Sequence, residues 1–234
     1  MSLDYAPNYS SKMRKRFNEL KIKFIYKWIF KELRTLSGSG GNFDLLEVGS
    51  GPGVFLDLLS KEFPSGKLHG VDISEDLVRF SRKINGEINY QVGDACNLPC
   101  NSSTFDYVIS QHVIEHIEDT SNFLEEIKRV LKPGGYFIFC TPNLNCISHR
   151  IAGNNWIGFK DPTHVSLKSS KEWRKVISEE GFIIEKDGST GVRGAGFIRK
   201  TPLYLLNVVP LSYRGFFNWD GGDTYVCVSR FATL

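Results

Sequence analysis

Short apolar segments alternate with amphipathic segments along most of the chain. The alternation predicts strands at 43–48, 67–72, 87–92, 105–110 and 135–141, with helices at 53–63, 75–84 and 119–131 between them. Further along, it predicts a helix at 169–180 and strands at 182–187 and 224–231. Strands that alternate with helices, and are as apolar as FDYVIS and YFIFC, predict an α/β fold with a mostly parallel sheet covered by helices on both faces.

Three segments lie outside this alternation. Residues 11–36 place apolar side chains at steps of mostly three or four with Lys and Arg between them, which predicts a basic amphipathic helix. Residues 141–168 have no lasting period and follow a central strand, so we expect them to form a lid over a substrate. The glycine-rich and aromatic residues 189–222 are expected to cover the same substrate.

The length of 234 residues predicts a single domain over residues 1–234. Its parts are an N-terminal helix or lid at 1–40, a ligand-binding core at 41–188, and the two substrate-covering insertions. A hydrophobic content of 41% and a charged content of 24% are typical of a globular protein. No stretch approaches the roughly 20 apolar residues that cross a membrane, and no apolar segment follows the basic N-terminus, so a cytoplasmic location is expected.

Charge bears on the binding partners of the chain, and cysteine content on its redox state and metal binding. Residues 1–36 hold nine Lys and Arg against three acids, a net of +6, whereas the whole chain carries +3. We expect the apolar side of this helix to pack on the domain and its lysines to face water; contact with a membrane surface or RNA is the alternative. Five cysteines without a C-x-x-C spacing favour reduced thiols over disulfides or a thiolate zinc site.

The most informative local motif is a glycine loop after the first strand. The segment LLEVGSGPGVFL carries Glu47 inside the strand and glycines at 49, 51 and 53, and the next strand ends at Asp72. A dinucleotide fingerprint needs its third glycine three residues after the second, whereas Gly53 follows Gly51 by two. An NAD-dependent oxidoreductase is therefore the less favoured alternative.

With this loop, GDACNLP at 93–99 and LKPGGYFIFCTPN at 131–143, the chain resembles the class I S-adenosylmethionine-dependent methyltransferases over about residues 40–188. The resemblance implies a Rossmann-like sheet of seven strands whose last strand is antiparallel. It also implies that the glycine loop carries the amino acid part of S-adenosylmethionine, that Asp72 holds the ribose and that Asp94 lies by the adenine. The cofactor-binding residues it predicts are Glu47, Gly49, Ser50, Gly51, Asp72, Ile73, Asp94, Ala95 and Gln111; Tyr9 and Arg14 are further candidates.

An H-x-x-E-H motif, made by His112, Glu115 and His116, follows the strand at 105–110. Its place in a strand-to-helix loop argues against a zinc peptidase, whose motif needs a long helix and a third ligand. The quinone-biosynthesis O-methyltransferases, which the chain also resembles, carry E-x-x-E-H here and are implicated in binding a divalent ion. Because imidazole suits Mg²⁺ less well than carboxylate, His112 weakens such a site and no metal is predicted.

Methyl transfer to oxygen calls for a general base, and histidine is the first candidate. His116 and His164 are the predicted catalytic residues. The alternatives are a cap or structural role for Glu115 and His116, and a simple loop contact between His164 and Asp161. Aromatic residues of the two insertions are expected either to stack on a substrate ring or sugar or to pack in the core: Trp156, Phe159, Phe216, Phe217 and Trp219.

The sequence predicts a methyltransferase acting on a small-molecule, glycan or lipid-linked acceptor, with oxygen as the receiving atom. After the strand at 105–110 the chain reads ISQHVIEH, which lacks the Pro-Pro-aromatic loop of methyltransferases that act on nucleobases. Nucleic acid is therefore not the favoured acceptor. The alternative is a protein that binds the cofactor but transfers nothing and acts as a scaffold through its basic helix. The sequence does not predict the oligomeric state.

Overall fold

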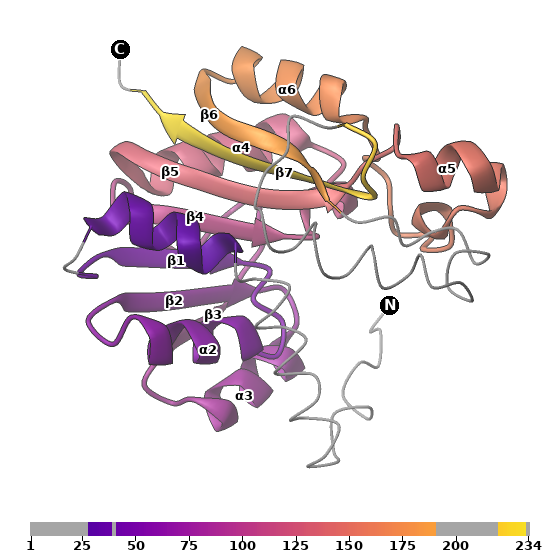
Figure 1. The fold of residues 1–234 in the computed structure, drawn as a ribbon. Helices are drawn as coiled ribbons and strands as arrows, with labels where there is room; N and C mark the ends of the chain where they lie inside the picture. Colours follow the sequence, from indigo (N-terminus) through magenta and orange to yellow (C-terminus); the bar gives the residue numbers. More distant parts are fainter. Residues whose placement is uncertain (1–27, 39–40, 191–219, 233–234) are drawn as a thin grey trace. The chain divides into compact units, whose positions relative to one another are not determined.

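The structure is a computed structural model, and it describes residues 28–38, 41–190 and 220–232 (Figure 1). The chain divides into two compact units, one before and one after the bond between Cys100 and Asn101. Each unit is described by itself. No helix among the described residues is both long enough and apolar enough to cross a membrane.

The first unit holds three parallel strands in the order β3-β2-β1 (Figure 1). They are β1 (Asp44–Val48), β2 (Lys67–Asp72) and β3 (Asn89–Val92). Two helices connect them, α2 (Val54–Glu62) and α3 (Glu75–Ile84), within one residue of the predicted bounds. Because β1 and β2 pair in register from Asp44 with Lys67 to Val48 with Val71, the loop after β1 lies beside the end of β2.

Residues 28–37 form the described part of the predicted N-terminal helix. Ile29, Phe30 and Leu33 are buried, and the ring of Phe30 stacks on that of Phe55 in α2, with centroids 5.8 Å apart. This apolar side therefore packs on the first unit, as the periodicity predicts. Residues 11–27 of the predicted helix, which include Arg14, and Tyr9 lie outside the described residues.

The second unit holds four strands in the order β4-β5-β7-β6. Strand β7 runs antiparallel to both of its neighbours, whereas β4 and β5 are parallel, so the expected antiparallel last strand is confirmed. The helices α4 and α6 flank this sheet (Figure 1). The bounds are β4 (Phe105–Gln111), α4 (Thr120–Val130), β5 (Leu131–Pro142), α6 (Ser170–Glu179), β6 (Phe182–Thr190) and β7 (Thr224–Phe231).

The core of the second unit is aromatic. The ring of Phe139 on β5 makes edge contacts with Trp173 on α6, at 6.1 Å, and with Tyr225 on β7, at 5.9 Å. Phe139 also stacks on Phe137, with centroids 5.0 Å apart. These contacts join α6 to the strands and fix the position from which the lid segment leaves β5.

The lid segment, residues 141–168, contains more regular structure than its sequence predicts. It forms α5 (Ile147–Ala152) and the 3-10 turns η4 (Gly153–Asn155) and η5 (Ile157–Phe159). Helices this short cannot establish a period in the sequence, and whether the segment acts as a lid stays a prediction. The sulfur of Cys146 caps α5 by accepting from the His149 N–H at 3.3 Å, and cysteine is not a usual capping residue. Most of the second insertion, residues 191–219, lies outside the described residues.

Candidate active site

The glycine loop of the first unit is held by backbone hydrogen bonds to the end of β2. The N–H groups of Gly49 and Ser50 both donate to the carbonyl of Val71, at 2.8 and 3.0 Å. The carboxylate of Asp72 accepts from Gly51 N–H at 2.8 Å through Oδ2 and from Ser74 N–H at 2.9 Å through Oδ1. Two backbone donors therefore fix this carboxylate at the carboxyl end of its strand.

The loop glycines serve different purposes. Gly49, Gly51 and Gly53 all have positive φ, at 75°, 52° and 74°, which other residues rarely adopt. A Cβ on Gly53 would lie 2.5 Å from the hydroxyl of Tyr90, so this glycine is required by packing. A Cβ on Gly51 would meet no atom within 4 Å. The backbone at Gly51 therefore faces open space, where a ligand can approach it closely.

Hydrogen-bond donors are available beside this space. Gly53 is the N-cap of α2 and offers no side-chain cap, so the N–H groups of the first turn are left for water or a ligand. The hydroxyl oxygen of Ser50 is buried and has no hydrogen-bond partner among the described residues. An anionic group such as a carboxylate suits the start of this helix.

Below the loop, Glu47 is 3% exposed and lies near the buried ring of Tyr90. Burial, reinforced by the negative charges of Glu47 and Asp57, raises the pKa of Tyr90 well above its ordinary value. Tyr90 stays a neutral hydrogen-bond donor and bonds the Gly53 carbonyl at 3.2 Å. The sequence did not indicate Tyr90, because its contact with the loop depends on how β3 pairs with β2 and β2 with β1.

The other predicted cofactor residues lie at strand ends. Ile73 follows Asp72 and is 76% exposed, which is unusual for so large an apolar side chain. Asp94 is exposed, and its Oδ1 accepts from Cys96 N–H at 2.8 Å; Ala95 beside it is half-buried. Gln111 is the last residue of β4 in the second unit and is partly exposed.

In the second unit, Glu115 is a fully buried anchor. Its carboxylate is 3.1 Å from Nδ1 of His112 and accepts from the Thr141 hydroxyl at 3.0 Å. Its carbonyl accepts from the N–H groups of Val165 and Ser166, both at 2.9 Å. The residue thus joins the 3-10 turn η3 (Ile114–His116) to the end of the lid segment, which supports the structural interpretation of Glu115.

His112 takes a positive φ of 54°, and its backbone N–H bonds the Cys140 carbonyl at 2.9 Å. The side chain of His112 is 48% exposed, and its contacts with Cys140 and Glu115 raise its pKa above the ordinary value. The side chain of His112 therefore acts as a partner of the buried Glu115.

The two predicted catalytic histidines lie side by side. The ring centroids of His116 and His164 are 4.8 Å apart, although the residues come from η3 and from the far end of the lid segment. Nδ1 of His116 is 2.8 Å from the hydroxyl of Thr163, and Nδ1 of His164 is 2.7 Å from the carbonyl of Gly158. The contact expected between His164 and Asp161 is a long one, 3.9 Å from Nε2 to Oδ2.

A metal ion could be held where these residues meet. One ligand atom each from Glu115, His116 and His164 lies within 4.8 Å of the others. Two imidazoles and one carboxylate suit a transition metal better than Mg²⁺. The carboxylate of Glu115 already accepts from Thr141, so a metal would compete with an existing bond. The prediction of no metal stays a prediction.

The lid segment packs on its own aromatic residues. Trp156 is 1% exposed, and its ring lies 5.3 Å from both His149 and Phe159. The core-packing interpretation therefore holds for Trp156, whereas Phe159 is 43% exposed. Phe216, Phe217 and Trp219 lie outside the described residues.

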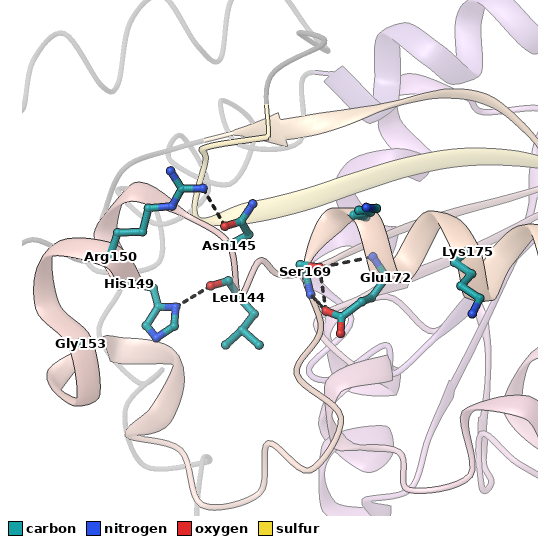
Figure 2. Close-up of a pocket in the computed structure, with 9 residues that line it drawn as sticks. Leu144, Asn145, His149, Arg150, Gly153, Ser169, Glu172 and Lys175 are labelled. Carbon is teal, nitrogen blue, oxygen red and sulfur yellow. Dashed lines mark hydrogen bonds between the residues drawn. The ribbon is translucent and has the colours of Figure 1, made fainter.

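A cavity of about 800 Å³ lies between the start of the lid segment and α6 (Figure 2). Leu144, Asn145, His149 and Arg150 line it from the lid side, and Ser169, Glu172 and Lys175 line it from α6. Figure 2 shows Arg150 bonded to Asn145, and His149 turned toward the carbonyl of Leu144. Sequence reasoning missed this cavity, because its walls come from two segments with no shared motif.

The parallel strands, their connecting helices and the loop after β1 belong to the Rossmann-like α/β class, in which ligands bind beyond the carboxyl ends of the strands. Residues 46–139 match the methyltransferase domain family. This match, together with the relatives described below, supports the class I S-adenosylmethionine-dependent methyltransferase family that the motifs predict.

Known proteins resemble the chain over different lengths. A protein of Mycolicibacterium smegmatis, described as a probable S-adenosylmethionine-dependent methyltransferase, is 35% identical over 61% of this chain and 52% of its own length. A ubiquinone biosynthesis O-methyltransferase of Hydrogenovibrio crunogenus is 27% identical over 58% of this chain and 54% of its own length. The chain thus spans about half the length of these curated relatives.

Among solved structures, a chain from the complex between the Haloferax volcanii Trm112 methyltransferase activator and its methyltransferase has a TM-score of 0.68. It is 20% identical and covers 96% of both chains. This likeness confirms the predicted fold class, a Rossmann-like fold with seven described strands.

Proposed function

We propose that this chain transfers the methyl group of S-adenosylmethionine to a small-molecule, glycan or lipid-linked acceptor, with oxygen as the receiving atom. The observation that carries the proposal is the carboxylate of Asp72. Two backbone N–H groups, of Gly51 and Ser74, hold it next to the open backbone of the glycine loop.

The residues of the loop fit S-adenosylmethionine. Each oxygen of Asp72 accepts one backbone hydrogen bond and can accept a second, which suits the two hydroxyls of a ribose. The exposed side chain of Ile73 offers an apolar surface to a purine, and the start of α2 offers donors to a carboxylate. The proposed set is completed by Glu47, Gly49, Ser50, Asp94, Ala95 and Gln111.

When bound, S-adenosylmethionine supplies a methyl group on a positively charged sulfur, which becomes a neutral thioether on transfer. An oxygen acceptor must lose its proton as its electron pair forms the bond to the methyl carbon. We propose that Nε2 of His116 takes this proton and later passes it to water. His116 is exposed, whereas the side chain of His164 is only 13% exposed and supports its neighbour.

Three further observations support the acceptor class. A histidine pair is more useful to an oxygen acceptor, which must be deprotonated, than to a carbon or nitrogen that can lose its proton later. The curated relative named as an O-methyltransferase acts on oxygen by its name. The cavity between the lid segment and α6 has the size of a small-molecule site, and Arg150 and Lys175 would favour an acidic acceptor. The cytoplasmic location stays a prediction.

Labelled methyl transfer tests the proposal. The full chain is incubated with methyl-¹³C S-adenosylmethionine and a cell extract, and the labelled products are identified by mass spectrometry and by the ¹³C shift of the new methyl group. We expect a methoxy signal with the native chain and loss of most of it with His116→Ala. A labelled methyl on carbon or nitrogen would contradict the oxygen assignment. Silence across broad extracts, despite cofactor binding, would favour a cofactor-binding scaffold, and binding of NADH instead would favour an oxidoreductase.

A further inference from the structure

Both histidine rings are contacted at Nδ1, that of His116 by Thr163 in the turn at residues 161–164 and that of His164 by Gly158. The hydroxyl of Thr163 is 2.8 Å from Nδ1 of His116, and the Thr163 carbonyl is 3.2 Å from the same nitrogen. On the other ring, Nδ1 of His164 is 2.7 Å from the carbonyl of Gly158. The chemistry of these partners decides which nitrogen of each ring carries the proton.

The hydroxyl of Thr163 has already used its proton. It donates to Oδ1 of Asp161 at 2.6 Å, and the same carboxylate oxygen also accepts from the Thr163 backbone N–H at 2.9 Å. A hydroxyl that donates to a carboxylate can only accept from its other neighbour. Both partners of Nδ1 in His116 are therefore acceptors, so Nδ1 must carry the proton, and Nε2 is left with its lone pair.

We propose that Asp161 and Thr163 are positioning residues that hold His116 in the Nδ1–H tautomer, so that Nε2 is the atom that accepts the proton of the methyl acceptor. Histidine in water favours the other tautomer, with the proton on Nε2, which could not act as a base at that atom. The chain Asp161–Thr163–His116 thus prepares the ring before substrate binds. This inference rests on the proposed function for its catalytic meaning but not for its geometry.

Charge supports the same arrangement. Hydrogen bonds from the hydroxyl and the backbone N–H of Thr163 hold the pKa of Asp161 below its usual range, although desolvation opposes them. The carboxylate therefore stays ionised at neutral pH and can stabilise positive charge on His116 through the hydroxyl between them. The ring of His164, whose centroid lies 4.8 Å away, is oriented separately by the contact of its Nδ1 with the Gly158 carbonyl.

The direct test is the tautomer itself, read by long-range ¹H–¹⁵N NMR of the full chain at a pH where His116 is neutral. We expect the native chain to show the proton of His116 on Nδ1. Thr163→Val removes the nearer acceptor but leaves the carbonyl at 3.2 Å, so the ratio of Nδ1–H to Nε2–H should fall about fivefold, the worth of one ordinary hydrogen bond. Thr163→Ser should restore the native ratio. Thr104→Val is the matched control, because the Thr104 hydroxyl bonds loop carbonyls elsewhere.

Turnover is measured on the same variants with labelled S-adenosylmethionine and cell extract. Thr163→Val should lower turnover in proportion to the fraction of His116 that keeps the Nδ1–H form, by at most about fivefold, without changing affinity for S-adenosylmethionine, and Thr163→Ser should recover it. An unchanged tautomer in Thr163→Val overturns the inference, whatever the activity. A tautomer that shifts as expected, together with full activity in His116→Ala, supports the role of the turn in setting the ring and contradicts His116 as the base of the proposed function.

Discussion

The glycine loop and the histidine pair are built in different ways. The loop with Asp72 is held by backbone donors and acceptors, so its shape follows from glycine positions and strand register. In the second unit, His116 is held by the hydroxyl of Thr163, which Asp161 orients, and His164 is held by the carbonyl of Gly158. The first arrangement is suited to binding a fixed cofactor, and the second to tuning the protonation of a single ring.

This difference predicts that variants will separate into two groups. Changes at the loop should reduce affinity for S-adenosylmethionine or the stability of the first unit. Changes at the histidine pair should reduce turnover at nearly constant affinity, because they act on proton transfer alone.

The largest expected effect is that of His116→Ala on turnover. Loss of a general base typically costs about 10²–10⁴ in rate, and the loop that binds the cofactor is untouched. Turnover is measured with labelled S-adenosylmethionine and affinity by calorimetry. His69→Ala on β2 is the control, since that ring contacts Asn89 and should leave turnover unchanged. A large loss of affinity for S-adenosylmethionine in His116→Ala would contradict the separation of cofactor binding from proton transfer.

Gly53→Ala tests how much the packing of the glycine loop contributes to the stability of the first unit. The new Cβ would meet the Tyr90 hydroxyl and Ser81 Cβ at 2.5 and 2.7 Å, at a φ of 74°. Strain and overpacking together should lower the free energy of unfolding by about 2–5 kcal/mol, measured by denaturant titration.

Gly51→Ala is the companion variant. Its new Cβ has space around it, so the substitution should cost only the backbone strain, about 1–2 kcal/mol, but weaken cofactor binding. Equal stability of the two variants would contradict the packing role of Gly53.

Gly158→Ala tests how far the histidine region depends on the lid segment. A Cβ at this position would lie 2.1 Å from the ring of Trp156, so the turn η5 must shift and take with it the carbonyl that bonds His164. We expect a loss of about 1–3 kcal/mol in local stability, seen as faster hydrogen exchange in residues 156–159. Unchanged exchange there would show that the lid segment tolerates the displacement.

The smallest effect concerns acid pH. The pKa of Asp161 is lowered by its bonds from Thr163, so this carboxylate stabilises the turn above its unfolded pKa, about 3.9, and the contribution is lost as pH falls through the lower folded pKa. The amide signal of Thr163, which donates to Asp161, should therefore titrate with a midpoint below about 3.9 in NMR. Asp161→Asn should abolish the titration. A midpoint at or above that value would mean that the hydrogen bonds add nothing.

Much of the fold was predictable because its signals are local. Strand β2, helix α3 and strand β7 have the predicted bounds, and the spacing of the glycines with Asp72 indicated the loop and its acid partner. These features depend on neighbours in sequence or on parallel register. Gly53 illustrates the limit: its spacing was evident from the sequence, but the clash that a side chain there would make with Tyr90 depends on β3, which no local pattern reveals.

The histidine region shows what the sequence could not provide. His116 and His164 were each candidates, but nothing in the spacing predicted that their rings would meet. The role of Thr163 requires knowing which of its neighbours donates, and the burial of Trp156 depends on helices too short to leave a period. Such contacts are decided by tertiary packing.

Calorimetric titration of S-adenosylmethionine into Asp72→Ala tests the central claim most directly, with Asp76→Ala as a matched control because Asp76 is exposed and pairs with Arg79 on the surface of α3. Loss of two hydrogen bonds from a ribose to a charged carboxylate, each worth about 1.5–3 kcal/mol, should weaken binding by roughly 100-fold or more. The control should bind as the native chain does. Native affinity in Asp72→Ala, with the fold intact by circular dichroism, would contradict the account.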